Sequence, residues 1–231
     1  MSEYRSLNLL AYDHLRRMIY EGELTFNTIY SETKLARELA VSRTPMRDAL
    51  NRLSQERYID ILPNRGFILH TPTKDDIHEA YHVRLMIEVY CAQIVAQHYP
   101  DKESCTTIEQ MEIALNLQRH LLEEDTAYSL SEFWLDDLVF HKSLLEHLNI
   151  SSLCTQYDRY MHIFMPHHLI EELDIHQKQA RTFERHQSTL VEHAAILDAL
   201  RSRDTDRVQA AVRTHVDSSL KALFISSEDA F

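Results

Sequence analysis

Two histidines in the first half of the sequence have the spacing of a zinc-protease motif. Residues 78–82 read HEAYH, and on a helix the i and i+4 positions place His78 and His82 on one face, with Glu79 beside them as a general base. A protease also needs a third ligand. The histidine of the extended motif is absent, although Glu103 or Glu109 is available downstream. So short a motif also occurs by chance, and a zinc hydrolase using HEAYH is the alternative function.

A second set of possible ligands lies further along the chain. The stretch FWLDDLVFHKSLLEHL places Asp137 and His141 at i and i+4 on one helix. His193 and His215 lie about ten residues before and about nine after a break near Arg203–Asp206, which puts the imidazoles at similar height on an antiparallel helical hairpin. One carboxylate and three imidazoles would then converge, a set that suits zinc, nickel or another divalent transition metal. Each histidine alone could instead be a surface or hydrogen-bonded core residue.

Arg84 lies in the same acidic part of the chain and has two interpretations. Its guanidinium could bind the carboxylate of a small ligand through paired hydrogen bonds. It could equally form a structural ion pair with Glu88, four residues later on the same helix. The sequence gives no role to His167 and His168, which stand next to each other near an expected bend between helices.

The first seventy residues contain the elements of a DNA-binding domain. A helical apolar pattern stops at Gly22, and two short amphipathic segments follow, opened by the possible N-caps Ser31 and Ser42. Two short helices joined by a tight turn form a helix-turn-helix, whose second helix enters the major groove of DNA. The segment YIDILPNRGFILH alternates around a turn, which predicts a two-stranded wing with Gly66 at a positive φ.

The candidate DNA contacts lie at two places in this winged helix-turn-helix. Arg43, Thr44 and Arg47 are at the start of the second helix, the end that such a helix presents to base edges and phosphates. Arg65 and Gly66 are at the tip of the wing. A solvated helix face explains any one arginine, but it explains the whole set on this frame less well.

Composition and charge separate this region from the rest of the chain. The chain has 24 Lys and Arg against 36 Asp and Glu, of which 10 and 9 lie in residues 1–73, so this part carries +1 and residues 74–231 carry −13. Only 2 glycines and 5 prolines in 231 residues favour a mostly helical protein. We therefore predict a winged helix-turn-helix domain over residues 1–72 and an all-helical bundle of about six helices over residues 73–231.

The same composition limits the cellular setting. There is no long apolar run and no secretory signal pattern, so we expect a cytoplasmic protein that does not enter a membrane. Cys91, Cys105 and Cys154 are far apart and odd in number, which favours neither disulfides nor a thiolate metal site. Thr73 and Asp76 form a capping box that begins the first helix of the bundle.

The N-terminal motifs resemble a known family. SETKLARELAVSRTPMRDALNRLSQERYIDILPNRGFILH is similar to the DNA-binding domain of the GntR family of bacterial transcription regulators. In that family the arginines after the turn contact DNA, which implies this role for Arg43 and Arg47, with Thr44 beside them and the wing at Arg65 and Gly66. The sequence departs from the family pattern at Ala40, where glycine is common, and at Thr33. It also lacks the usual Pro-Gly before the first of the two short helices, where LTFNTIYSE stands.

The acidic part resembles the FCD effector domain of the FadR subfamily of these regulators. VRLMIE, DLVFHKSLLEHLN and EHAAILDALRSRDTDRVQAAVRTH match its signatures. The resemblance implies that Asp137, His141, His193 and His215 bind a divalent metal that a small organic acid coordinates. The expected protein is not an enzyme. It is a ligand-responsive transcription regulator that binds a palindromic double-stranded DNA operator as a homodimer, since one recognition helix reads only a half-site.

Overall fold

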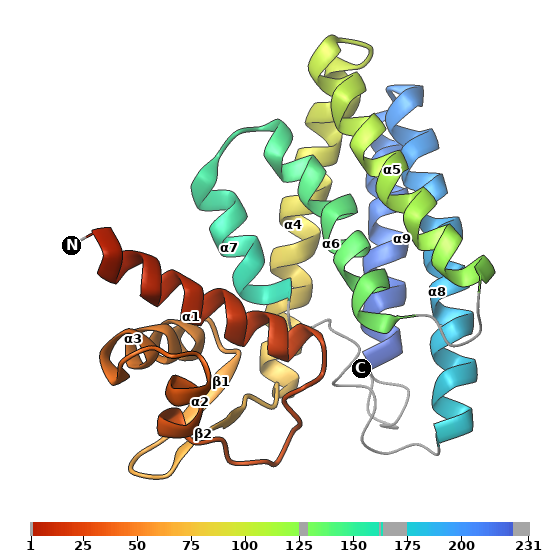
Figure 1. Cartoon of the computed structure of the whole chain (residues 1–231). Coiled ribbons are helices and arrows are strands. Elements are labelled where there is room, and N and C mark those ends of the chain that lie inside the picture. Colours follow the sequence, from red (N-terminus) through yellow and green to blue (C-terminus); the bar gives the residue numbers. More distant parts are fainter. Residues whose placement is uncertain (1, 125–128, 162, 164–174, 224–231) are drawn as a thin grey trace. The chain divides into compact units, whose positions relative to one another are not determined.

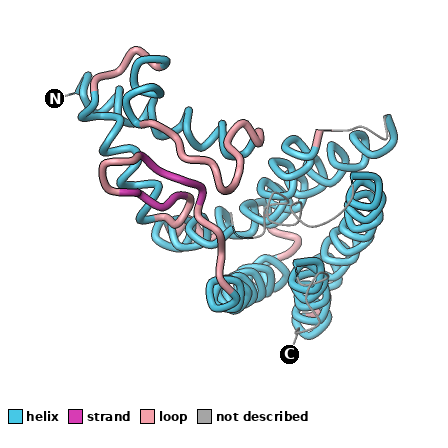
Figure 2. The backbone as a smooth tube through the Cα atoms, turned by 90° about the horizontal axis from the view of Figure 1, so that it is seen from below, coloured by secondary structure: helices cyan, strands magenta, loops and turns pink. Residues whose placement is uncertain are grey.

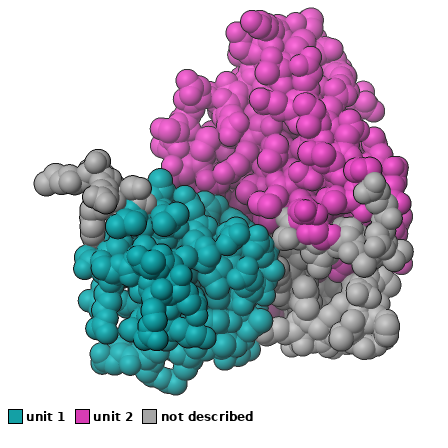
Figure 3. Space-filling view, in the orientation of Figure 1, with its two compact units in different colours: residues 1–72 teal, residues 73–231 magenta. Residues whose placement is uncertain are grey.

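The structure, a computed structural model, describes residues 2–124, 129–161, 163 and 175–223. The chain divides into two compact units, residues 1–72 and 73–231 (Figure 3). The first unit contains α1 (Ser2–Tyr20), α2 (Glu32–Glu38), α3 (Arg43–Gln55), β1 (Ile59–Leu62) and β2 (Gly66–Leu69). The second contains α4 (Lys74–His98), α5 (Lys102–Glu124), α6 (Leu130–His147), α7 (Ser151–Met161), α8 (Ile175–Ser202) and α9 (Thr205–Leu223) (Figure 1).

The helix-turn-helix is formed by α2 and α3, as the sequence predicts. Ser31 caps α2, because its side chain accepts a hydrogen bond from the backbone N–H of Lys34. Ser42 stands at the N-cap position of α3 but makes no side-chain cap hydrogen bond. The turn between the helices passes through Ala40, whose φ of 52° lies in the left-handed region. This conformation explains why glycine is common at the position.

The wing is an antiparallel pair of strands, in which Ile59 is paired with Leu69 and Leu62 with Gly66. Its inner side chains Ile59, Phe67 and Leu69 are buried. They join a core to which α1 and α3 contribute their apolar stripes, since α1 packs on α3 and α3 on β1. The other core residues of these two helices are Ala11, Leu15, Ile19, Met46, Ala49, Leu50 and Leu53.

The second unit is an all-helical bundle around α4. The predicted capping box is present: Asp76 N–H donates to the Thr73 side chain, and Thr73 N–H donates to the Asp76 carboxylate. Helix α4 packs on α6, α7, α8 and α9, and α5 packs on α6 and α8. Left-handed residues end α6 and α8, at Asn149 with a φ of 51° and at Arg203 with a φ of 62°. Figure 2 shows several of these helices nearly end-on.

The bundle has six helices within the described residues, which agrees with the predicted fold class. The sequence also predicts a helix over residues 150–170, of which the structure describes Ser151–Met161 as α7. His167 and His168 lie outside the described residues. In the part of the chain that the structure describes, no helix is both long and apolar enough to span a membrane.

Candidate metal centre and DNA-binding surface

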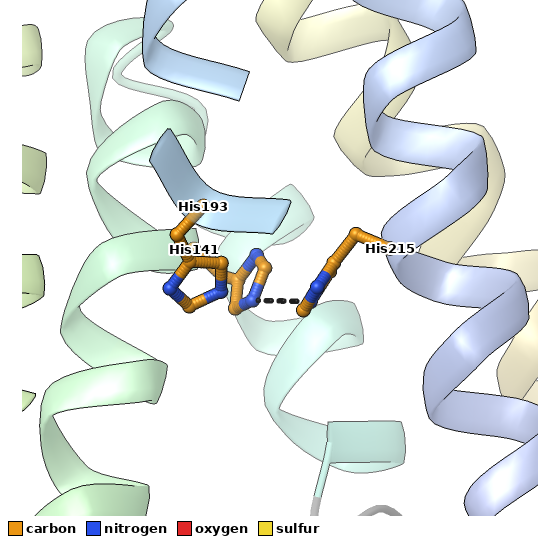
Figure 4. A group of neighbouring side chains, drawn as sticks. All are labelled: His141, His193 and His215. Atoms are coloured by element: carbon orange, nitrogen blue, oxygen red, sulfur yellow. Dashed lines mark hydrogen bonds between the residues drawn. The ribbon is translucent and has the colours of Figure 1, made fainter. Parts of the chain in front are cut away.

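Three of the predicted ligands meet in the interior of the bundle. His141 on α6, His193 on α8 and His215 on α9 each offer a ring nitrogen, and these three atoms lie within 4.8 Å of one another. Their side chains are at most 1% exposed. Figure 4 shows the rings of His141 and His215 facing each other across the centre. Their Nε2 atoms lie 3.1 Å apart. The antiparallel hairpin of α8 and α9 therefore brings together two histidines that are 22 residues apart.

Apolar neighbours fix the orientation of these rings. Phe140 stacks on His193 with the ring centroids 3.8 Å apart and the planes at 6°. It meets His141 edge-on at 5.3 Å. Leu144 and Leu145 are fully buried one turn further along α6. A polar cluster in such surroundings must be satisfied by its own members, because solvent does not reach it.

The predicted carboxylate ligand lies beside the imidazoles. Asp137 is 7% exposed, and its two oxygens lie 3.5 Å from His193 Nε2 and 3.7 Å from His141 Nε2. These distances are longer than a strong hydrogen bond. The i, i+4 spacing on α6 thus places Asp137 and His141 on the same side of the centre, as the sequence predicts.

Two of the three imidazoles are held by a hydrogen bond at their other nitrogen. His193 Nδ1 donates to Gln118 Oε1 at 3.0 Å, and His215 Nδ1 donates to Glu192 Oε2 at 2.9 Å. His141 Nδ1 lies 3.0 Å from Glu88 Oε2. Histidines that bind metals in proteins usually donate their second N–H to such an acceptor, which fixes the tautomer and the ring orientation.

Gln118 and Arg84 identify the tautomers. The amide nitrogen of Gln118 donates to the Phe133 carbonyl at 3.4 Å and to Asp137 Oδ1 at 3.3 Å, so its oxygen must face His193. Arg84 Nη2 lies 2.9 Å from Nε2 of both His141 and His215. A guanidinium only donates, so both Nε2 atoms carry lone pairs. The two Nε2 atoms, which lie 3.1 Å apart, are therefore both acceptors, and both accept a hydrogen bond from the Arg84 guanidinium.

Arg84 and Glu88 form a buried ion pair, which was the structural interpretation of Arg84. Arg84 Nε donates to Glu88 Oε1 at 2.6 Å, and Tyr157 OH donates to the same oxygen at 2.6 Å. Burial alone would raise the pKa of the Glu88 carboxyl, but Arg84 and His141 hold it well below its usual range. Glu88 is therefore charged at neutral pH, and it orients the guanidinium towards the imidazoles.

Two of the three imidazoles, those of His193 and His215, are kept neutral. Burial, followed by the neighbouring imidazoles and the Arg84 charge, lowers the pKa of His193 and of His215 well below the usual value. Neutral imidazole is the form of histidine that binds a metal. The Nε2 atom of His193 has no hydrogen-bond partner. A buried acceptor without a donor costs free energy, and the donor set of three imidazoles and one carboxylate fits a divalent transition ion.

The HEAYH motif lies elsewhere, on the first turns of α4. His78 and His82 are exposed and contact each other. Within the described residues, no third His, Cys, Asp or Glu brings a ligand atom close enough to complete a three-ligand group with them. Glu79 accepts a hydrogen bond from Tyr160 OH at 2.8 Å. The geometry gives no support to the zinc hydrolase alternative.

The candidate DNA contacts are on the surface of the first unit. Arg43, Thr44 and Arg47 are exposed at the beginning of α3, while the opposite side of the helix is buried. Arg47 Nε lies 3.6 Å from a carboxylate oxygen of Glu32 at the start of α2. Because the Arg47 side chain is 68% exposed, this ion pair is weak and a phosphate can replace it.

The wing tip borders the same surface. A groove between α2, α3 and the wing is lined by residues that include Glu32, Arg47, Asn51 and Arg65. Arg65 is exposed. Gly66 has a φ of 122°, and a Cβ atom added there would lie 2.0 Å from the carbonyl oxygen of Tyr30. Gly66 is thus required by the close approach of the chain at Tyr30, whether or not it contacts DNA.

Some residues of the buried centre were not identified from the sequence. Gln118 and Glu192 hold two of the three imidazoles, and Tyr157 holds Glu88. One signal for Gln118 was available: it continues the buried stripe of Met111, Ala114 and Leu115 on α5. A polar residue at an apolar position of a stripe is usually there to bind another buried polar group.

Comparisons with known proteins agree with this architecture. Residues 8–69 match the family described as bacterial regulatory proteins, gntR family, and residues 79–218 match the FCD domain. The gluconate operon transcriptional repressor of Bacillus licheniformis is 25% identical over 206 residues, which are 88% of this chain and 79% of the relative. The transcriptional repressor RspR of Escherichia coli is 26% identical over 217 residues, or 91% and 86% of the two chains.

Solved structures share the fold. Escherichia coli McbR/YncC matches with a TM-score of 0.75 at 18% identity, over 94% of this chain and 97% of that one. A putative GntR regulator from Rhodococcus sp. RHA1 matches with a TM-score of 0.75 at 21% identity, over 95% and 99%. With both domain matches, the chain belongs to the GntR family of bacterial transcription regulators, with the FCD architecture of the FadR subfamily, and its role is DNA-binding regulation and not enzymatic catalysis.

Proposed function

We propose that this regulator senses a small organic acid through a divalent metal bound inside the helical unit. The observation that carries the proposal is the convergence of His141, His193 and His215 beside Asp137 in a buried site. Their Nδ1 atoms face Glu88, Gln118 and Glu192, which leaves the Nε2 atoms for the ion. Zinc and nickel are the ions that this donor set suits best.

A bound metal would offer open coordination positions to a carboxylate oxygen of the effector. The residues of the chain have two tasks there. Asp137 supplies a negative charge next to the imidazoles, which offsets the charge of the ion. Gln118 and Glu192 keep the rings in the tautomer that presents a lone pair to the centre. Burial keeps competing water away and strengthens each electrostatic contact.

Arg84 is the residue that would bind the effector carboxylate. Its Nη2 takes the lone pairs of His141 and His215, the same lone pairs that a metal requires. A metal held by these imidazoles would therefore displace Nη2 from them, while the Nε hydrogen bond to Glu88 could remain. A guanidinium that keeps its Nε hydrogen bond to Glu88 and loses its Nη2 contacts with the imidazoles could donate from Nη2 to a carboxylate bound to the ion.

In the first unit, Arg43, Thr44 and Arg47 would contact the major groove, with Arg65 on the adjacent backbone. One such helix reads a half-site, so the proposed active form is a homodimer on a palindromic operator. The effector changes operator affinity only if it binds the two arrangements of the protein unequally. One relative is named for repressing a gluconate operon, and gluconate is itself a small carboxylate, which places sugar acids in the first effector screen.

Equilibrium dialysis with zinc or nickel, followed by elemental analysis, tests the metal part. We expect about one ion per chain at low micromolar metal from the buried centre. His193→Gln and His215→Gln should lose this ion, while His120→Gln, which changes an exposed histidine on α5, should retain it. Equal metal content in all variants, or no binding by the wild-type chain, would contradict the proposal.

A thermal-shift screen of mono- and dicarboxylates, with and without metal, tests the effector part. Stabilisation should require metal and should disappear in Arg84→Gln, because a ligand that binds only the folded state raises the unfolding temperature. A carboxylate that stabilises metal-free and metal-loaded protein equally would exclude coordination to the ion. Operator binding with the active acid then shows whether the effector weakens or strengthens DNA affinity.

To test the DNA contacts, the purified protein is first used to select a DNA duplex that it binds from a pool of random-sequence duplexes. Arg43→Ala and Arg47→Ala should each weaken binding and reduce its dependence on salt, since each removes a cationic contact. Arg119→Ala removes an exposed arginine of the other unit and should leave affinity unchanged. If DNA affinity survives both changes in α3, the recognition helix is assigned wrongly.

A further inference from the structure

The HEAYH segment has no role in the regulator described above, yet it places two metal-binding groups together on the surface. The Nε2 atoms of His78 and His82 lie 3.2 Å apart. Their ring centroids are 4.5 Å apart, and the ring planes are at 75°. Both side chains are exposed, so an ion in solution can reach these nitrogens directly.

The separation of the two nitrogens fits a shared ion. Metal–imidazole bonds are about 2.0–2.1 Å long, so two nitrogens on one ion stand about 2.9 Å apart at a right angle and about 3.4 Å apart at the tetrahedral angle. The observed 3.2 Å lies between these limits. The separation of the two nitrogens therefore does not have to change for both to bind the same ion.

The helix keeps the pair in this arrangement. Residues i and i+4 are neighbours on a helix surface, and the capping box of Thr73 and Asp76 secures the turn before His78. The Tyr81 ring contacts His82 edge-on at 5.0 Å. The simpler explanation of the short distance is one N–H···N hydrogen bond between neutral rings. If the pair is only hydrogen-bonded and shares no ion, replacing either histidine should not lower the metal affinity beyond the loss of one independent ligand, and the two explanations can therefore be separated by experiment.

We propose that His78 and His82 form a surface chelate for a divalent transition metal, separate from the buried centre. Two imidazoles favour copper over nickel and zinc, and water fills the remaining positions. The site binds a metal but does not hydrolyse a substrate. Glu79 accepts a hydrogen bond from Tyr160. The described residues provide no third His, Cys, Asp or Glu ligand close to the pair.

Chromatography on an immobilised metal distinguishes this pair from the buried histidines. An ion held on a resin can bind only exposed side chains, and His141, His193 and His215 are at most 1% exposed. The full-length chain without an affinity tag should be retained on a copper- or nickel-loaded resin. His78→Gln and His82→Gln should each elute at clearly lower imidazole, because a lone histidine loses the advantage of an intramolecular second ligand.

Matched controls make this result specific. His120→Gln removes one exposed histidine on α5 and should elute with the wild-type chain. Titration with copper in solution should give an affinity at least about tenfold weaker for each single variant of the pair, with unchanged circular dichroism. His193→Gln should keep the resin retention, so failure of the buried centre and failure of this site are distinguishable. Identical elution of wild type, His78→Gln and His82→Gln would refute the surface chelate.

Discussion

His186 makes the stability of the helical unit dependent on pH. It lies on α8, two turns before His193, and is 7% exposed. Its ring stacks on Phe133 with the centroids 3.8 Å apart and the planes at 4°. Burial, together with the charge of Arg185, lowers the pKa of His186 from 6.5 to about 3. The His186 imidazole is therefore neutral in the folded protein at both pH 7 and pH 5.

The size of the effect follows from proton linkage. The folded pKa lies below the unfolded pKa, so the stabilisation is present above pH 6.5 and is lost as the pH falls towards 3. Between pH 7 and pH 5 the unfolded chain takes up a proton that the folded chain does not bind. This uptake lowers the free energy of unfolding by about 2 kcal/mol.

Urea unfolding of the wild-type chain and of His186→Phe at the two pH values measures this contribution. Phenylalanine keeps an aromatic ring against Phe133 but cannot bind a proton. Trp134, the only tryptophan, is buried on α6, so its fluorescence reports on this unit. Other titrating groups are common to both proteins and cancel in the comparison. If both proteins lose the same free energy of unfolding between pH 7 and pH 5, His186 is not buried as a neutral group.

Substitutions at three further positions test other parts of the structure. Ala40→Gly should stabilise the first unit by about 1 kcal/mol in urea unfolding, because it relieves a left-handed alanine. Gly66→Ala should weaken binding to a selected DNA duplex, because the new Cβ would collide with the Tyr30 carbonyl and displace the wing. Gln118→Ala should lower metal affinity about 10- to 100-fold in competition with a chelating dye, whereas Gln118→Glu, which keeps an acceptor for His193, should retain more of it.

The local signals of the sequence were sufficient for the fold. Helix periodicity, the cap at Ser31 and the capping box of Thr73 and Asp76 depend on residues within one or two turns, and the structure confirms them. The same local rule was insufficient at Ser42, where the N-cap side chain makes no cap hydrogen bond. Short-range patterns define where an element begins, but the rotamer of a capping side chain also depends on its surroundings.

The buried centre shows where sequence reasoning stops. Asp137 and His141 follow from spacing on one helix, and the meeting of His193 with His215 follows from the length of a hairpin. The acceptors behind the rings do not follow in this way. Gln118 lies on another helix, α5, and its contact with His193 joins two residues that are 75 apart in the sequence. Which polar residue faces which ring depends on the rotation of each helix about its axis, and local periodicity does not determine that rotation to within one side chain.

The two interpretations of Arg84, an ion pair with Glu88 and a donor to a carboxylate ligand, are geometrically compatible. The guanidinium has five N–H donors in a fixed plane. The Nε edge is occupied by Glu88 at 2.6 Å, and this contact aims Nη2 at His141 and His215. A lysine could form one of these contacts but could not be held by one edge and present the other. The ion pair with Glu88 would therefore position Arg84 for the proposed effector carboxylate, and Arg84→Lys should impair the proposed effector response more than it impairs folding.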